Sequence, residues 1–161
     1  MTNQKFSVAF VCMGNICRSP MAEAVFNKTV SDLGYSDSID KVDSFGTHAY
    51  HSGEDPDYRT LETCRRHSVP VKHHAQSISA NDFKEFDYII GMDRSNMAAL
   101  EKKRPQGSKA IVKMFGEWRT DPSYGKIIED PYYGGSSGFE RCYNQVRHFS
   151  EEFLKQEIGE K

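Results

Sequence analysis

VAFVCMGNICRSP occupies residues 8–20 of this 161-residue chain. The segment begins with apolar and β-branched residues, which are typical of a strand buried on both faces of a parallel sheet. Gly14 and Asn15 follow, and these residue types adopt positive φ angles most easily, so the backbone can curl and turn its N–H groups inward. A helical apolar pattern starts after Pro20. The predicted order is therefore a strand, an anion-binding loop and a helix.

The composition of this loop predicts a site for an oxyanion and a reactive thiol. Ser19 and Pro20 are expected to be the N-cap and first residue of the helix, which would direct its free N–H groups at the loop. Arg18 offers a planar fork that binds tetrahedral oxyanions through two hydrogen bonds. Each of these groups favours the thiolate form of Cys12, so we predict a nucleophile that accepts a phosphoryl group without a metal. The alternative is an inert thiol beside a solvated arginine.

Length and charge limit the classes of function. A chain of 161 residues predicts one domain, residues 1–161, with one core. The net charge of -2 and the pI near 6.3 provide no basic field for nucleic acid or for an acidic membrane. Residues 1–6 are polar, and no apolar run approaches the roughly 20 residues that span a bilayer, so we expect a cytoplasmic protein. The four cysteines have neither metal-ligand spacing nor the density of a disulfide scaffold, and reduced thiols are expected.

Strands and helices alternate along the rest of the chain. Apolar residues recur with helical spacing from Ala22 to Leu33, and Gly34 is expected to end that helix. The remaining pattern predicts strands at 6–12, 41–44, 87–92 and 109–115, helices at 57–67, 79–86, 94–103 and from 139 onward, and a long loop at 116–138. Cys64 and Cys142 lie on apolar helical faces and are expected in the core. The predicted fold is α/β, a single-domain three-layer sandwich with a four-stranded parallel twisted sheet and helices on both faces. Such sheets bind ligands at the carboxyl ends of their strands, where Cys12 lies.

A phosphoryl transfer to Cys12 also requires an acid to protonate the leaving oxygen and later a base to activate water. One carboxyl group can serve both steps. Aspartate precedes proline at Asp55, Asp121 and Asp130, and composition alone does not choose among them. The flanking apolar and aromatic residues of IIEDPYYG favour Asp130, because they would partly desolvate its carboxyl group.

The chain resembles the low molecular weight protein tyrosine phosphatases. The C-x5-R-S loop at the N-terminus, with its GNICRSP filling, is highly specific to that family, and EDPYYG is similar to its second signature. The resemblance covers nearly the whole chain, and DSFGT and FGEW favour a fungal member. It implies an acid phosphatase type of enzyme that hydrolyses protein phosphotyrosine and small aryl phosphates through a phosphocysteine, with no cofactor and no metal. It also selects Asp130 as the general acid and base.

Further site residues follow from matching positions in the family. The loop residues Met13, Gly14, Asn15, Ile16, Cys17 and Ser19 would bind the phosphate or a similar oxyanion, with Ser19 also steadying the Cys12 thiolate. Tyr132 and Tyr133 would wall the pocket and could stack on an aryl group. Ser44 and His73 would support Asn15, and Asp93 would be a structural aspartate. Tyr50 stands on the expected pocket rim, with His51 beside it, where many members carry tryptophan, which leaves substrate preference open.

The resemblance also implies redox regulation, because a disulfide between Cys12 and Cys17 would switch activity off reversibly. A related arsenate reductase would need further relay cysteines, and none lies between Cys64 and Cys142. A phosphopeptide-binding module would need neither Cys12 nor Asp130. A metal site formed by Cys12, Cys17 and the histidines lacks ligand spacing. We expect a monomer, with a weak dimer as the alternative.

Overall fold

The computed structural model describes residues 5–48, 50–133 and 136–160. Within these residues, four parallel strands form one sheet with the order β2-β1-β3-β4. The strands are β1 (Phe6–Cys12), β2 (Ile39–Gly46), β3 (Tyr88–Gly91) and β4 (Ile111–Met114). The helices are α1 (Arg18–Leu33), α2 (Tyr58–Arg66), α3 (Asp82–Glu85), α4 (Arg94–Lys103) and α5 (Ser136–Glu157), with short 3₁₀ helices at Ser36–Ser38, Phe115–Trp118 and Pro131–Tyr133.

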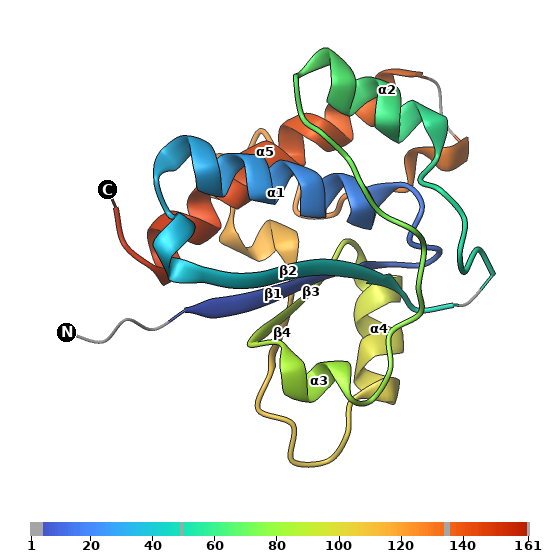
Figure 1. Cartoon of the computed structure of the whole chain (residues 1–161), viewed down its shortest axis with the longest axis vertical. Coiled ribbons are helices and arrows are strands. Elements are labelled where there is room, and N and C mark those ends of the chain that lie inside the picture. Colours follow the sequence, from blue (N-terminus) through green and yellow to red (C-terminus); the bar gives the residue numbers. More distant parts are fainter. Residues whose placement is uncertain (1–4, 49, 134–135, 161) are drawn as a thin grey trace.

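Helices cover both faces of the sheet, as predicted. Helices α1, α2 and α5 lie on one face, and α3 and α4 lie on the other (Figure 1). The alternation of side chains along β1 explains this arrangement. Phe10 belongs to the apolar cluster beneath α1 and α5, whereas Ala9 and Val11 belong to a second cluster with Phe83 and Leu100 on the opposite face. The α/β three-layer sandwich is therefore confirmed.

The central position of β1 places the end of the strand at the crevice of the sheet. Cys12 pairs with Gly46 of β2, and Val11 pairs with Gly91 of β3. The chain leaves β1 into the α1 crossover on one face, while the neighbouring strand β3 leads to α4 on the other face. In parallel sheets, ligands bind at the point where the connections from two adjacent strands run to opposite faces of the sheet.

Several boundaries differ from the prediction. Strand β2 is longer than residues 41–44 because it pairs with β1 from Phe6 to Cys12. The loop predicted at 116–138 contains the 3₁₀ helix Pro131–Tyr133 and most of the 3₁₀ helix Phe115–Trp118, and α5 begins at Ser136. Cys64 and Cys142 lie in the core with exposures of 0% and 1%, which confirms that prediction. None of the described helices combines the length and the apolar character needed to cross a bilayer.

Candidate active site

A hollow of about 140 Å³ opens at the carboxyl end of β1. The backbone turns through residues 13–17 between β1 and α1, and this turn forms most of the hollow. The lining residues are Cys12, Met13, Gly14, Ile16, Cys17, Arg18, His51, Asp130 and Tyr132. The first N–H groups of a helix have no acceptor within the helix, so α1 presents donors and the positive end of its dipole to this hollow. The structure thus brings together the residues predicted to be nucleophile, oxyanion binder and acid.

Ser19 connects the thiol to the loop. Its Oγ lies 3.0 Å from the Cys12 Sγ and 2.8 Å from the Asn15 Nδ2. Because the amide nitrogen donates to this oxygen, the hydroxyl hydrogen is left for the sulfur or for the Phe45 carbonyl oxygen, which lies 3.4 Å away. The prediction that Ser19 is the N-cap and Pro20 the first helical residue is wrong: α1 begins at Arg18, and the residue before it, Cys17, makes no side-chain capping bond. The Ser19 hydroxyl is directed into the loop instead of capping the helix.

Asn15 holds the shape of the loop. It has a φ of 60°, in the left-handed region, and its side chain is almost completely buried. Its Oδ1 accepts hydrogen bonds from the Gln76 backbone N–H at 2.9 Å and from the His73 Nε2 at 2.7 Å. Gly14, in contrast, does not adopt a positive φ. A Cβ at this position would lie 2.9 Å from the Cδ2 of the His51 side chain, which would have to shift.

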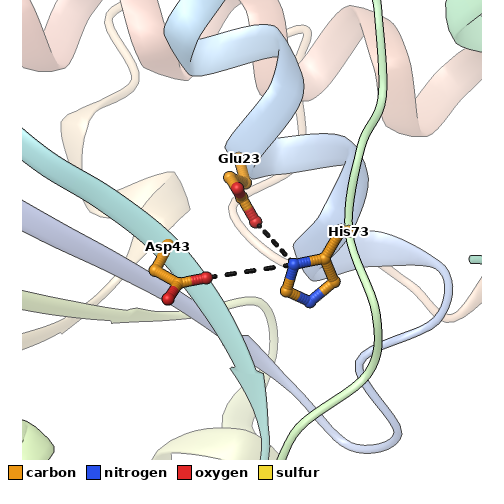
Figure 2. Close-up of side chains that lie close together, drawn as sticks. All are labelled: Glu23, Asp43 and His73. Atoms are coloured by element: carbon orange, nitrogen blue, oxygen red, sulfur yellow. Dashed lines mark ion pairs between the residues drawn. The ribbon is translucent and has the colours of Figure 1, made fainter. Parts of the chain in front are cut away.

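A polar cluster behind Asn15 supports this conformation (Figure 2). Ser44 accepts a hydrogen bond from the Asn15 Nδ2 at 3.1 Å and donates one to the Glu23 Oε1 at 2.7 Å. The His73 Nδ1 lies 3.3 Å from the same Glu23 oxygen and 3.9 Å from the Asp43 Oδ1. Ser44 and His73 therefore contact Asn15 as the resemblance implied. Glu23 and Asp43 were missed, because neither carries a local signal that separates it from a surface carboxylate.

The Glu23, Asp43 and His73 side chains place potential metal-ligand atoms within 4.8 Å of one another. The Glu23 Oε1 already accepts the Ser44 hydroxyl, and the Asp43 Oδ1 accepts the Ser44 backbone N–H at 2.8 Å and the Gln76 amide at 3.1 Å. This pattern fits a hydrogen-bond network better than a metal site. Burial raises the pKa of Glu23 to about 7 and lowers the pKa of His73. The cluster thus changes its protonation near neutral pH.

Arg18 is fixed by groups from two distant segments of the chain, and its exposed fraction is 3%. Its Nη1 donates to the Asp93 Oδ2 at 2.6 Å and to the Ile128 carbonyl at 2.8 Å. Its Nη2 lies 3.8 Å from the Asp130 Oδ2. Burial alone lowers the pKa of Arg18, but Cys12 and the two carboxylates outweigh it, so the pKa is raised and the side chain stays cationic. Asp93 also caps α4 by accepting the Asn96 N–H at 2.8 Å.

A family model described as "Low molecular weight phosphotyrosine protein phosphatase" matches residues 7–161. The chain belongs to this family. A Saccharomyces cerevisiae low molecular weight phosphotyrosine protein phosphatase is 50% identical over 155 residues, which cover 96% of each chain. The Schizosaccharomyces pombe protein of the same name is 51% identical and covers 94% of this chain and 97% of its own length.

A solved structure agrees with this assignment. The Entamoeba histolytica protein tyrosine phosphatase, crystallised with Hepes in the active site, superposes with a TM-score of 0.89 at 33% identity. The alignment covers 96% of this chain and 99% of the other. The low molecular weight phosphatase fold expected from the loop motif is therefore confirmed. The identities of 50% and 51% to yeast proteins also agree with the expected likeness to fungal members.

The structure separates the three Asp-Pro pairs of this low molecular weight phosphatase. Asp130 lines the hollow, and its Oδ1 accepts the Tyr132 N–H at 3.0 Å. Asp55 instead pairs with His74 at 3.2 Å, and Asp121 accepts the Ser123 N–H at 2.9 Å. Neither of these two carboxylates lines the hollow. The placement supports the choice of Asp130 that the resemblance made.

Not all of the aromatic residues predicted for the rim line the hollow. Tyr132 lines the hollow and is 41% exposed, but the side chain of Tyr133 lies outside the described part of the chain. Tyr50 does not line the hollow; it is 75% exposed and stacks on His48 with the ring centroids 5.2 Å apart. His51 lines the hollow in its place, with its Nδ1 3.1 Å from the Glu54 carboxylate. A rim position was predictable, but which of two adjacent side chains turns inward depends on the loop backbone.

Proposed function

We propose that this protein hydrolyses phosphotyrosine in proteins, and small aryl phosphate monoesters, through a covalent phosphocysteine. The observation that carries the proposal is that Cys12, Arg18 and Asp130 line one small hollow at the start of a helix. The names of the yeast relatives support the substrate class. The apolar side chains of Ile16 and Tyr132 on the wall suit an aromatic leaving group.

In the first step the Cys12 sulfur attacks phosphorus, and the bond from phosphorus to the phenolic oxygen breaks. Arg18 and the N–H groups of the loop bind the phosphoryl oxygens, where negative charge is held during transfer. Asp130 gives its proton to the leaving oxygen, so that a neutral phenol departs. Ser19 donates a hydrogen bond to the sulfur and steadies its anionic form.

In the second step Asp130, now ionised, takes a proton from water. The resulting hydroxide attacks phosphorus, the bond from phosphorus to sulfur breaks, and inorganic phosphate leaves with Cys12 again a thiolate. The Asp130 side chain is 31% exposed, so water can reach it. No cofactor or metal is required by these steps.

Cys17 gives the same site a redox response. Both Cys12 and Cys17 line the hollow and are free thiols. Burial and the nearby Asp57 raise the pKa of Cys17, so it remains protonated while Cys12 reacts. We propose that peroxide oxidises Cys12 to a sulfenic acid, that the Cys17 thiol displaces water from it, and that the disulfide formed is reversed by an added thiol. The free cysteines of the described chain favour a reducing, cytoplasmic location.

The test is a comparison of three variants on p-nitrophenyl phosphate and a phosphotyrosine peptide. Cys12→Ser should abolish turnover and form no radiolabelled phosphocysteine on rapid acid quenching. Asp130→Ala should slow turnover by about 10²–10⁴-fold. Asp121→Ala, another Asp-Pro aspartate that lies away from the hollow, should leave the rates unchanged. Normal turnover by Cys12→Ser, or phosphate binding without any hydrolysis by the unmodified protein, would overturn the proposal.

A further inference from the structure

Arg59 and Asp57 form a rigid pair at the start of α2. Asp57 caps this helix by accepting the Arg59 backbone N–H at 2.8 Å. The Arg59 side chain binds both carboxylate oxygens, with its Nε 3.0 Å from Oδ1 and its Nη2 2.9 Å from Oδ2. This fork geometry fixes the plane of the guanidinium more firmly than a single contact would.

The pair is anchored to the turn through residues 13–17 between β1 and α1, which we call the phosphate-binding loop. The Asp57 backbone N–H donates to the Ile16 carbonyl at 2.7 Å. One residue beyond Arg59, the Thr60 hydroxyl donates to the Cys17 carbonyl at 3.2 Å. The first turn of α2 therefore moves with the backbone that surrounds Cys12.

The remaining guanidinium nitrogen of Arg59 contacts the segment that carries Asp130. Its Nη1 donates to the Tyr132 carbonyl at 3.2 Å, and the Tyr132 N–H in turn donates to the Asp130 carboxylate at 3.0 Å. The guanidinium also lies over two aromatic rings, 5.2 Å from the Tyr132 centroid and 4.7 Å from the Phe139 centroid. Arg59 thus connects the phosphate-binding loop to Tyr132, which lies 73 residues beyond Arg59 in the chain.

We propose that Arg59 is a positioning residue that holds the Asp130 carboxyl group in register with the leaving oxygen of a substrate bound at Cys12. The inference rests on the proposed function, because it assigns a purpose to a contact with the general acid. Arg18 and Gln145 hold the preceding residues through the Ile128 and Ile127 carbonyls. Those two bonds lie before Asp130, and Arg18 also lies 3.8 Å from the Asp130 carboxylate itself. Arg59 adds a contact on the far side of Asp130, through the Tyr132 carbonyl. Displacement of a catalytic group by about 1 Å can cost 10²-fold in rate.

The rate lost when a general acid is misplaced depends on how much the leaving group needs a proton. A general loss of structure would instead lower the rate for all substrates alike, so the two effects can be told apart. A good leaving group such as p-nitrophenol departs without full protonation, whereas phenol requires it. The value of kcat/KM reports the step in which the phenol leaves, so it should be measured for a series of aryl phosphates. Arg59→Met keeps an apolar stem over the two rings but removes the donors to Asp57 and Tyr132. We expect it to lower kcat/KM for phenyl phosphate about tenfold more than for p-nitrophenyl phosphate.

Two further variants complete the experiment. Arg65→Met removes an arginine of the same helix that is 75% exposed and pairs only with Glu62 among the contacts described, so it should change neither rate. Arg59→Lys keeps the charge without the fork and should give an intermediate leaving-group dependence; it also serves if Arg59→Met does not fold. An equal loss for both substrates, or no loss, in the folded Arg59 variant would overturn the inference.

Asp130→Asn distinguishes failure of the inference from failure of the proposed function. It should show the steepest dependence on the leaving group of all the variants. If Asp130→Asn lacks that dependence, the assignment of the acid is wrong. If it shows the dependence and Arg59→Met does not, the acid stands and the positioning role of Arg59 is rejected.

Discussion

The side-chain amide of Asn15 donates a hydrogen bond to the hydroxyl oxygen of Ser19 at 2.8 Å, and that hydroxyl lies 3.0 Å from the Cys12 sulfur. The residue that shapes the loop therefore also orients the group that faces the nucleophile. Ser19→Ala should lower kcat by about 10- to 100-fold, since a hydrogen bond to a charged partner contributes roughly 1.5–3 kcal/mol. Steady-state kinetics would measure this, with Ser31→Ala on the exposed side of α1 as the control. A normal kcat in Ser19→Ala would show that the hydroxyl is dispensable.

Asp93 orients Arg18 through a 2.6 Å hydrogen bond. Asp93→Asn keeps the shape and an oxygen able to cap α4, but it removes the negative charge that faces the buried guanidinium. We expect the KM for aryl phosphates to rise and kcat/KM to fall about tenfold or more, because Arg18 loses its preferred orientation. Asp82→Asn, at the half-buried start of α3 and outside the hollow, is the control. Unchanged kinetics in Asp93→Asn would indicate that the Ile128 carbonyl alone orients Arg18.

Gly46 allows β2 to pass close to the phosphate-binding loop. A Cβ at this position would lie 2.8 Å from the Met13 carbonyl oxygen and 3.0 Å from the His48 carbonyl oxygen. Gly46→Ala should reduce the free energy of unfolding by about 1–3 kcal/mol, as overpacking does, and lower activity by displacing the loop. Urea denaturation would measure the loss. Gly125→Ala, whose Cβ would have its nearest neighbours at 3.9 Å, should be tolerated.

Glu23 makes the stability depend on pH. Its pKa is raised from 4.5 to about 7 by burial, so the folded protein binds a proton there more tightly than the unfolded chain does. The stabilisation is complete below pH 4.5 and is lost as the pH rises through 7. The glutamine of Glu23→Gln does not titrate, so its stability lacks this pH dependence. The free energy of unfolding of Glu23→Gln minus that of the unmodified protein should therefore increase between pH 4.5 and 7, by an amount on the order of 3 kcal/mol.

Urea denaturation at a series of pH values would test this. Comparing the two proteins at each pH removes the contribution of titrating groups that lie away from Glu23, which both proteins contain. Glu62→Gln, on an exposed pair of α2, should show no such trend. A difference between Glu23→Gln and the unmodified protein that stays constant with pH would contradict the expectation.

Cys17 should protect the enzyme from permanent oxidation. After brief exposure to peroxide, the unmodified protein should regain activity when a thiol reductant is added. Cys17→Ser cannot form the disulfide, so further oxidation of Cys12 should leave it largely inactive. Activity before and after reductant, together with mass spectrometry of the peptide containing Cys12, gives the answer. Equal recovery of both proteins would reject the redox role.

The fold and the loop were predictable because their signals are local. Buried strands in parallel sheets read as continuous apolar runs, and the Cys12 to Ser19 motif carries its own turn residues. The supports of the loop were not predictable from local signals, because they come from residues far apart in the chain. The family resemblance alone predicted supporting roles for Ser44, His73 and Asp93. No supporting role was predicted for Glu23, Asp43 or Asp57. The Ser19 N-cap was wrongly predicted because its hydroxyl has a better partner within the loop.

Arg18 binds a carbonyl oxygen that lies 110 residues further along the chain. During synthesis the N-terminal thiol and arginine leave the ribosome long before the aspartate that would protonate a substrate. The Arg18 side chain therefore reaches its final position only after residues 128–130 have been synthesised and have packed beside it. A chain that stops short of residue 128 lacks one of the acceptors that hold the Arg18 guanidinium, so we expect its loop not to be preorganised for a phosphate group.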